Sequence, residues 1–122
     1  MTEVQLVVHS IHDVVVVNLG ESTILDGTTI ESIGKQLYVL VDEQAQRKVL
    51  LNFSRVKFLS SMMLGVLIRL QKRSAAIKGR VVIVGLRPDL HKVFKITRLE
   101  KLFDFYGDEK DALSSFGVYT QP

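Results

Sequence analysis

Short apolar runs along the 122-residue chain predict a sheet of five strands. Runs rich in β-branched and aromatic residues are typical of strands. They occur at Val4–Val8, Val14–Leu19, Arg47–Phe53, Val81–Val84 and Phe103–Tyr106. Because the connection around Ser10–Asp13 is short and mostly polar, we expect the first two runs to form a hairpin. The continuous apolar character of the third run predicts a central strand that is buried on both faces.

Two longer segments have apolar residues at helical spacing. The first begins with a capping box, in which Thr28 and Glu31 can bond free helix amides reciprocally. The second begins at Ser60–Ser61 and ends at Lys78–Gly79, with Gly near the usual C-terminal position. The residues that form the expected core-facing stripes are Ile30, Ile33, Leu37 and Val41 in the first helix and Met63, Val66, Leu67 and Leu70 in the second.

Two shorter helices are expected in the last third of the chain. Pro88 suits the first turn of a helix, where its missing N–H is harmless. A second capping box, Thr97 with Glu100, indicates a fresh helical start or a kink. The acidic residues in 108–111 favour the start of a last helix, because its dipole attracts negative charge.

The predicted element order is ββαβαβαβα, and it defines the fold class. Alternating strands and helices imply parallel pairing with crossover helices. We therefore predict a single α/β domain over residues 1–122, with an ordered core of about 3–117. Its sheet is mixed and mostly parallel, and about four helices pack against it.

The composition excludes several classes of function. The chain has no cysteine, so disulfides, thiolate metal sites and a cysteine nucleophile are excluded. The three histidines, His9, His12 and His91, lack ligand spacing, so we expect neither a metal site nor a cofactor. Neither a signal peptide nor an apolar run of membrane-spanning length is visible, which predicts a cytoplasmic protein without a membrane partner.

The charge distribution is equally unspecific. A formal net charge of +3 is too small to argue for nucleic acid binding. The one basic cluster, Arg69, Lys72 and Arg73, is interpreted as a solvated helix face. Because nothing ties a histidine to a serine, no catalytic triad can be assigned.

The stretch Val49–Arg73 carries the most information, because a buried strand leads directly to a helix that starts with two serines. A serine there can act as an N-cap, a contribution of about 0.5–2 kcal/mol. A serine there can also be phosphorylated, which adds about −1.5 to −2 charge. The two roles are compatible, since Ser60 or Ser61 can cap while the other faces solvent.

A surface beside these serines is a candidate partner-binding site. Helical spacing places Met62, Gly65 and Arg69 on a strip that faces away from the core. Met62 either packs under the neighbouring loop or serves as an adaptable contact residue. The loop before the first helix is expected at the same end of the sheet and could form the other half of the surface, through Glu21, Ser22, Thr23 and Asp26. Asp26 can alternatively cap the helix that follows it.

The run from Phe58 to Gly65 reads FLSSMMLG, and it resembles the STAS family of bacterial anti-sigma factor antagonists and their relatives. The family motif reads roughly Asp-Ser-Ser/Thr-Gly-Leu-Gly after an aromatic and an aliphatic residue. The matching positions are Phe58, Leu59, Ser61, Leu64 and Gly65. Ser60 stands where the family usually has Asp, and Met62 and Met63 replace the small Ser/Thr-Gly pair. The resemblance covers nearly the whole chain, and the predicted element order is that of STAS domains.

The resemblance implies a regulatory binding module and not an enzyme. In the family the serine after the Asp is phosphorylated, and by position that serine is Ser61, with Ser60 the less favoured site. The implied partners are an anti-sigma factor that is also a serine kinase, which the unmodified form binds, and a PP2C-type phosphatase.

Two other functions remain open at this point. The departures from the motif at Ser60 and Met63 favour a constitutive STAS adaptor in a signalling complex or transport system. An enzyme or nucleotide-binding protein could use the strand–helix crevices of a parallel sheet, although neither a nucleophile–base pair nor a ligand set is visible. The N-terminal hairpin is expected to leave an exposed edge strand that could support a homodimer.

Overall fold

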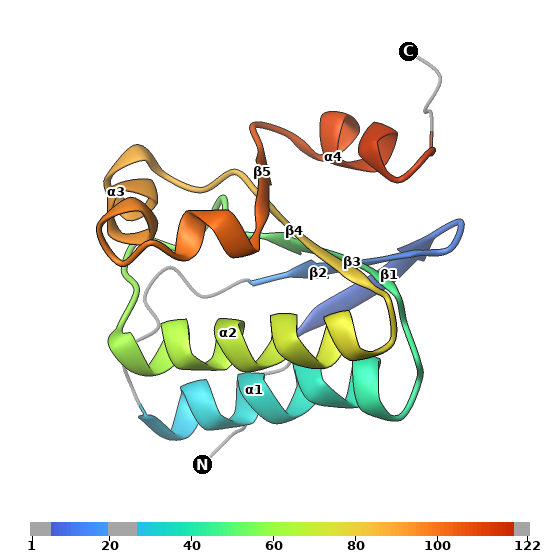
Figure 1. The fold of residues 1–122 in the computed structure, drawn as a ribbon, viewed down its shortest axis with the longest axis horizontal. Helices are drawn as coiled ribbons and strands as arrows, with labels where there is room; N and C mark the ends of the chain where they lie inside the picture. The colour runs from blue at the N-terminus through green and yellow to red at the C-terminus, as the bar shows by residue number, and fades with distance from the viewer. Residues whose placement is uncertain (1–5, 20–26, 119–122) are drawn as a thin grey trace.

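In the computed structural model, which describes residues 6–19 and 27–118, one sheet lies between two layers of helices (Figure 1). The elements in chain order are β1 (Val7–Ile11), β2 (Val14–Asn18), α1 (Gly27–Asp42), β3 (Lys48–Asn52), α2 (Ser61–Ala76), β4 (Arg80–Val84), α3 (Pro88–Ile96), the short 3-10 helix η1 (Leu99–Leu102), β5 (Asp104–Tyr106) and α4 (Glu109–Ser115). The predicted element order is confirmed, with η1 added between α3 and β5.

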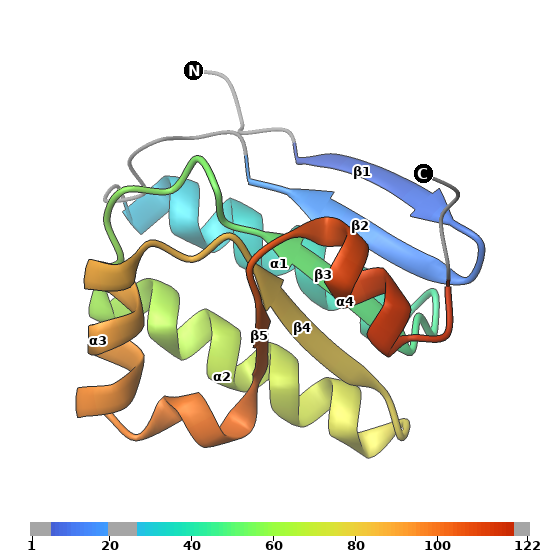
Figure 2. The ribbon, with the colours of Figure 1, turned by 90° about the horizontal axis from the view of Figure 1, so that it is seen from above.

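The strands follow one another across the sheet in the order β1-β2-β3-β4-β5. β1 and β2 form the predicted antiparallel hairpin, and the remaining neighbours pair in parallel. The carboxyl ends of β2, β3 and β4 therefore share one end of the sheet, which we call the serine end because α2 starts there. The amino ends of β3 and β4 share the opposite end with the β1–β2 turn (Figure 2), and we call it the hairpin end.

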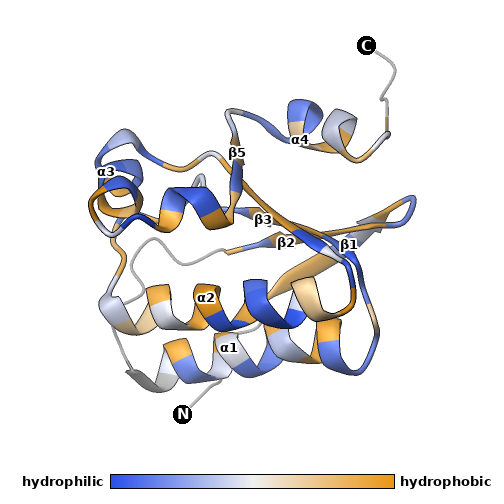
Figure 3. Cartoon of the chain, in the orientation of Figure 1, coloured by the Kyte–Doolittle hydropathy of each residue, from blue (hydrophilic) through white to orange (hydrophobic). Residues whose placement is uncertain are grey.

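The core lies on both faces of the sheet, because β2 and β3 alternate their apolar side chains between the two helix layers. Val15, Val17 and Leu51 belong to the larger cluster, with residues of α1, α2 and α3. Val16 and Leu50 belong to a smaller cluster, with residues of α4. Figure 3 shows these largely apolar strands between helices that carry both apolar and polar residues. The predicted burial of the third strand on both faces is confirmed. Because both faces of this strand are packed, the positions of its two ends are fixed.

Helices α1 and α2 pack side by side on one face of the sheet (Figure 1). A Cβ added at Gly34 of α1 would lie 3.3 Å from a methyl group of Val66 of α2, so glycine permits their close approach. Arg73 of α2 pairs with Asp42 of α1 and lies over the Tyr38 ring, 4.2 Å from its centroid. The orientation of α2 is therefore set by apolar packing and by cross-helix contacts.

The predicted end of the first strand is wrong. β1 begins at Val7 and extends to Ile11, because its pairing with β2 runs through Ser10, so the turn shrinks to His12 and Asp13. The predicted start at Val4 lies outside the described residues. The other strands begin or end within one residue of the predicted bounds.

Two predicted helix signals act differently in the structure. Lys78, not Gly79, takes the left-handed conformation after α2, with φ of 59°. Gly79 is required for another reason, because a Cβ there would lie 2.9 Å from a main-chain oxygen. Thr97 caps no new helix: its hydroxyl donates to the Val93 carbonyl at 2.7 Å and closes α3. α1 begins at Gly27, so Thr28 lies inside the helix and the N-cap position falls outside the described residues.

Candidate partner-binding site at the start of helix α2

A short connection fixed by two buried residues carries the chain from β3 to α2. Phe53 is fully buried, and its N–H donates to the Val84 carbonyl of β4 at 2.8 Å. Val56 is also fully buried, and its N–H donates to the Phe53 carbonyl at 2.9 Å. Because both anchors belong to the core, the start of α2 is held at the serine end of the sheet.

Ser60 is the N-cap of α2. Its backbone is extended, with φ of −91° and ψ of 163°, and its Oγ accepts the Met63 N–H at 3.1 Å. Its carbonyl accepts the Leu64 N–H at 3.1 Å. Met63 and Leu64 are both buried, so the cap and the apolar face of the helix fix the same turn. The expectation that one serine caps the helix is confirmed, and Ser60 is that residue.

Ser61 is the first residue of α2, and its side chain is exposed. Its hydroxyl forms no hydrogen bond with any part of the chain that the structure describes. The first turn of a helix has free N–H groups and the positive end of the dipole. An anion on the Ser61 oxygen would therefore be compatible with the helix, as anions commonly bind at helix N-termini.

Two large apolar side chains are exposed close to Ser61 in sequence. Phe58 in the connection is 52% exposed, and Met62 in the first turn is 44% exposed. Of the two interpretations of Met62, this exposure favours the contact residue. The sequence identifies Phe58 only as a match to the family motif. Its exposure is visible only in the structure.

Gly65 and Arg69 follow along the same exposed strip of α2. The Arg69 guanidinium folds back along the helix, since its Nη1 lies 3.5 Å from the position a Gly65 Cβ would take. Its Nε donates to the Tyr38 hydroxyl of α1 at 3.0 Å. The three residues of the basic cluster are exposed, as their interpretation as a solvated helix face predicts. Arg69 and Arg73 also link α2 to α1.

The other half of the predicted surface, Glu21, Ser22, Thr23 and Asp26, lies outside the described residues. β2 ends and α1 begins at the serine end of the sheet (Figure 1). The participation of these four residues stays a prediction.

Metal ligands and membrane-spanning helices are the other features that the described residues could contain. Within 6–19 and 27–118, no three His, Asp or Glu side chains are grouped so that they could hold a metal ion. No helix in these ranges combines the length and the apolar character needed to cross a membrane. His91 packs against Phe105, with ring centroids 4.7 Å apart, whereas His9 and His12 are exposed on the hairpin.

The element order and the mixed sheet, with α2 starting at the carboxyl end of β3, define an α/β domain of the STAS type. A family model of the STAS domain matches residues 5–112, and the chain belongs to the STAS domain family. Among curated proteins, the chain is similar to BtrV of Bordetella bronchiseptica, which is named as a proposed anti-sigma factor antagonist. The two are 25% identical over 93 residues, which cover 76% of this chain and 79% of BtrV.

Solved structures agree with the fold. An anti-sigma factor antagonist from Mycobacterium paratuberculosis superposes with a TM-score of 0.80 at 23% identity, over 93% of this chain and 94% of the other. The unphosphorylated form of SpoIIAA, an anti-sigma factor antagonist, gives 0.73 at 19% identity over 93% and 98% of the two chains. The phosphorylated form of SpoIIAA from Bacillus gives 0.72 at 21% identity over 92% and 99%. At these identities the similarity establishes a common fold.

Proposed function

We propose that this chain is an anti-sigma factor antagonist that binds an anti-sigma factor with serine kinase activity and releases it when Ser61 is phosphorylated. A PP2C-type phosphatase would restore the binding form. The module acts by binding, without catalysis or a cofactor, in the cytoplasm where sigma factors work. The observation that carries this proposal is the exposed Ser61 hydroxyl in the first turn of α2, beside exposed Phe58 and Met62, while Ser60 does the capping.

The proposed switch is electrostatic. A phosphoryl group at Ser61 adds about −1.5 to −2 charge at neutral pH. The helix dipole and free amides tolerate this charge, so the fold of the module stays the same. A partner that covers Phe58 and Met62 would have to desolvate the phosphate without pairing it, which costs several kcal/mol. Binding is therefore lost while the module remains folded.

The test compares two forms of Ser61. Ser61→Asp is expected to bind the anti-sigma partner at least about tenfold more weakly than Ser61→Ala. The free-energy cost of burying one unpaired charge exceeds about 1.4 kcal/mol, which corresponds to a tenfold change in Kd. Gln44→Asp is the matched control, because it adds the same charge at an exposed position after α1, away from both proposed interfaces. Equal binding by both Ser61 variants would contradict the switch.

Peptide mapping of the native protein tests the modification itself. Mass spectrometry across residues 58–69, in growth and in stress, should find a phosphate on Ser61 whose occupancy changes. An unmodified peptide in every condition would instead support the constitutive adaptor.

We also propose that two copies can associate through β1, which lies at the edge of the sheet. Val7 and Val8 on this strand are 61% and 43% exposed. Light scattering would detect the dimer, and Val8→Lys should shift it to monomer because an edge lysine opposes strand pairing. A monomeric wild-type protein at high concentration would refute this association.

A further inference from the structure

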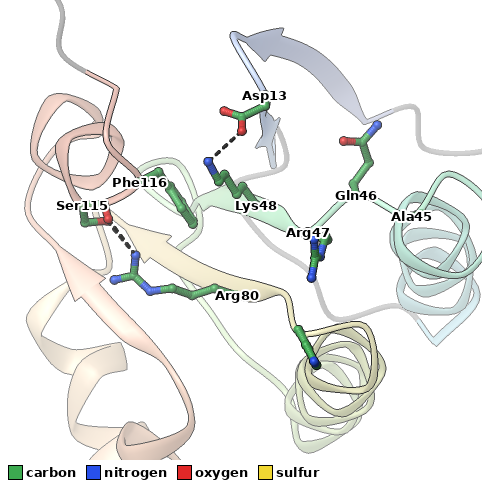
Figure 4. Close-up of a pocket in the computed structure, with 9 residues that line it drawn as sticks. Asp13, Ala45, Gln46, Arg47, Lys48, Arg80, Ser115 and Phe116 are labelled. Atoms are coloured by element: carbon green, nitrogen blue, oxygen red, sulfur yellow. Dashed lines mark hydrogen bonds and ion pairs between the residues drawn. The ribbon is translucent and has the colours of Figure 1, made fainter.

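The hairpin end of the sheet contains a cavity of about 650 Å³, within the size range of small-molecule sites. Segments far apart in sequence meet there: the β1–β2 turn, the loops before β3 and β4, and the end of α4 (Figure 4). The lining residues are Asp13, Ala45, Gln46, Arg47, Lys48, Lys78, Arg80, Ser115 and Phe116. Four of them are cationic and one is acidic, so the cavity has a net positive charge.

Arg80 is rigidly held at one side of the cavity. Its Nε donates to Asp104 at 2.7 Å, its Nη1 to the Ser115 main chain and hydroxyl at 3.2 and 3.1 Å, and its Nη2 to the Tyr106 hydroxyl at 3.1 Å. Its guanidinium lies over the Phe116 ring, 4.9 Å from the centroid. Burial opposes the charge, but the bonds to Asp104 and Tyr106 outweigh it and raise the pKa of Arg80. Arg80 and Phe116 thus form a preorganised wall, with a permanent charge over a largely buried aromatic ring that reaches the cavity.

Lys48 is paired with Arg80 where β3 and β4 run in parallel, and its side chain is held by a carboxylate. Its Nζ donates to Asp13 Oδ2 at 2.6 Å, as the dashed line in Figure 4 shows. Both groups are solvent-accessible, so an anion that enters the cavity can compete with Asp13 for the ammonium. Asp13 therefore limits the affinity of the cavity for anions.

Two further cations have side-chain nitrogen atoms that make no hydrogen bond with the described residues. Arg47 uses only its Nε within the described chain, in a bond of 2.9 Å to the Ile77 carbonyl, which leaves its terminal nitrogens free. Lys78 makes no hydrogen bond or ion pair with the described residues, and both side chains are exposed. Asp13 pairs with Lys48 and Asp104 pairs with Arg80, so the positive charges of Arg47 and Lys78 are not neutralised by either carboxylate.

We propose that this cavity binds a small phosphorylated molecule, with its phosphate among Arg47, Lys48 and Lys78 and its organic part against Phe116. Guanidinium and ammonium groups are the preferred protein ligands of phosphate. The aromatic wall favours a ligand that also has an apolar or planar portion. The cavity lies at the hairpin end, opposite Ser61, so the proposal does not depend on the proposed phosphorylation switch.

Amide NMR titration of the whole chain with phenyl phosphate and with inorganic phosphate tests the site. Both probes should give saturable shifts at the amides of Lys48, Lys78 and Ser115, with phenyl phosphate the tighter of the two. The combined variant Arg47→Gln with Lys78→Gln should weaken binding about tenfold, as expected when charge-assisted hydrogen bonds are lost. Lys92→Gln is the control, because it removes an exposed positive charge on α3, outside the cavity.

Asp13→Asn distinguishes a binding site from a purely structural ion pair between Asp13 and Lys48, because only a binding site predicts tighter binding of phosphate by this variant. This variant keeps the side-chain shape, removes the competing carboxylate and frees Lys48, so phosphate should bind several-fold more tightly. Tighter binding by Asp13→Asn together with unchanged binding by Lys92→Gln would support the site. Shifts spread over all surface lysines, equal weakening by Lys92→Gln, or no saturation would overturn it. Tighter binding of inorganic phosphate than of phenyl phosphate would overturn the role of Phe116.

Discussion

The two serines at the start of α2 are expected to contribute very differently to stability, although they are neighbours in the same turn. Ser60→Ala removes the oxygen that accepts the Met63 N–H at 3.1 Å. Water reaches this half-buried cap only in part, so we expect the free energy of unfolding to fall by about 1 kcal/mol. For a chain of this length the unfolding entropy is about 0.25 kcal/mol/K, so Tm should fall by about 4 °C.

Ser61 provides the matched comparison. Ser61→Ala removes a hydroxyl that has no partner in the described structure, and the change in stability should stay within about 0.5 kcal/mol. Ser61→Asp places a carboxylate at the positive end of the helix and should stabilise the protein by about 0.3–1 kcal/mol at low salt. Urea unfolding followed by circular dichroism measures all three variants. The assignment of the cap would be refuted if Ser61→Ala cost more than Ser60→Ala.

Three further variants test the packing and the electrostatics of the fold. Leu67→Ala should lower the free energy of unfolding by about 2–5 kcal/mol in a urea titration, because Leu67 is fully buried between α2 and the sheet. Gly79→Ala should destabilise by about 1–3 kcal/mol, since its Cβ would lie 2.6 Å from Ser74 Oγ, and a Tm equal to wild type would contradict this contact. Lys48→Gln should raise the pKa of Asp13 in an NMR pH titration, because the hydrogen bond from Lys48 is the largest cause of its lowered pKa. The small stability linked to Asp13 is present above its unfolded-state pKa and is lost as pH falls through the folded-state pKa, and Lys48→Gln should reduce that loss.

The parts of the fold that sequence predicted are those set by local pattern. The stripe on α2 and the branched run of β3 are buried as their spacing indicated, because burial on a helix or strand follows its period. Asp108 accepts the Asp111 N–H at 2.8 Å, as the acidic start of the last helix suggested. The predicted end of β1 was wrong because strand pairing with β2, which is a tertiary contact, decides where that strand ends.

The surface sites were only partly predictable. Ser61 could be proposed because the helix start and the motif are contiguous in sequence. The cavity at the hairpin end could not, because Lys48 and Arg80 each begin a strand and come together only when β3 and β4 pair in parallel. The one signal available was the charged residues Arg47, Lys48 and Arg80 at or just before the starts of two predicted strands, and it is weak since strand ends are commonly polar.

The STAS motif usually has an aspartate where this chain has Ser60. The aspartate would both cap the helix and add a negative charge beside Ser61, whereas Ser60 only caps the helix. Ser and Asp are about equally effective as N-caps, and Ser60 makes the capping bond to Met63 without a carboxylate. The start of α2 therefore does not depend on which of the two residues is present. The local charge does depend on it, because an aspartate would place a full negative charge beside the Ser61 oxygen. In the proposed switch, a phosphate on Ser61 would then meet the helix dipole without that repulsion, so the difference between the two states would come from Ser61 alone.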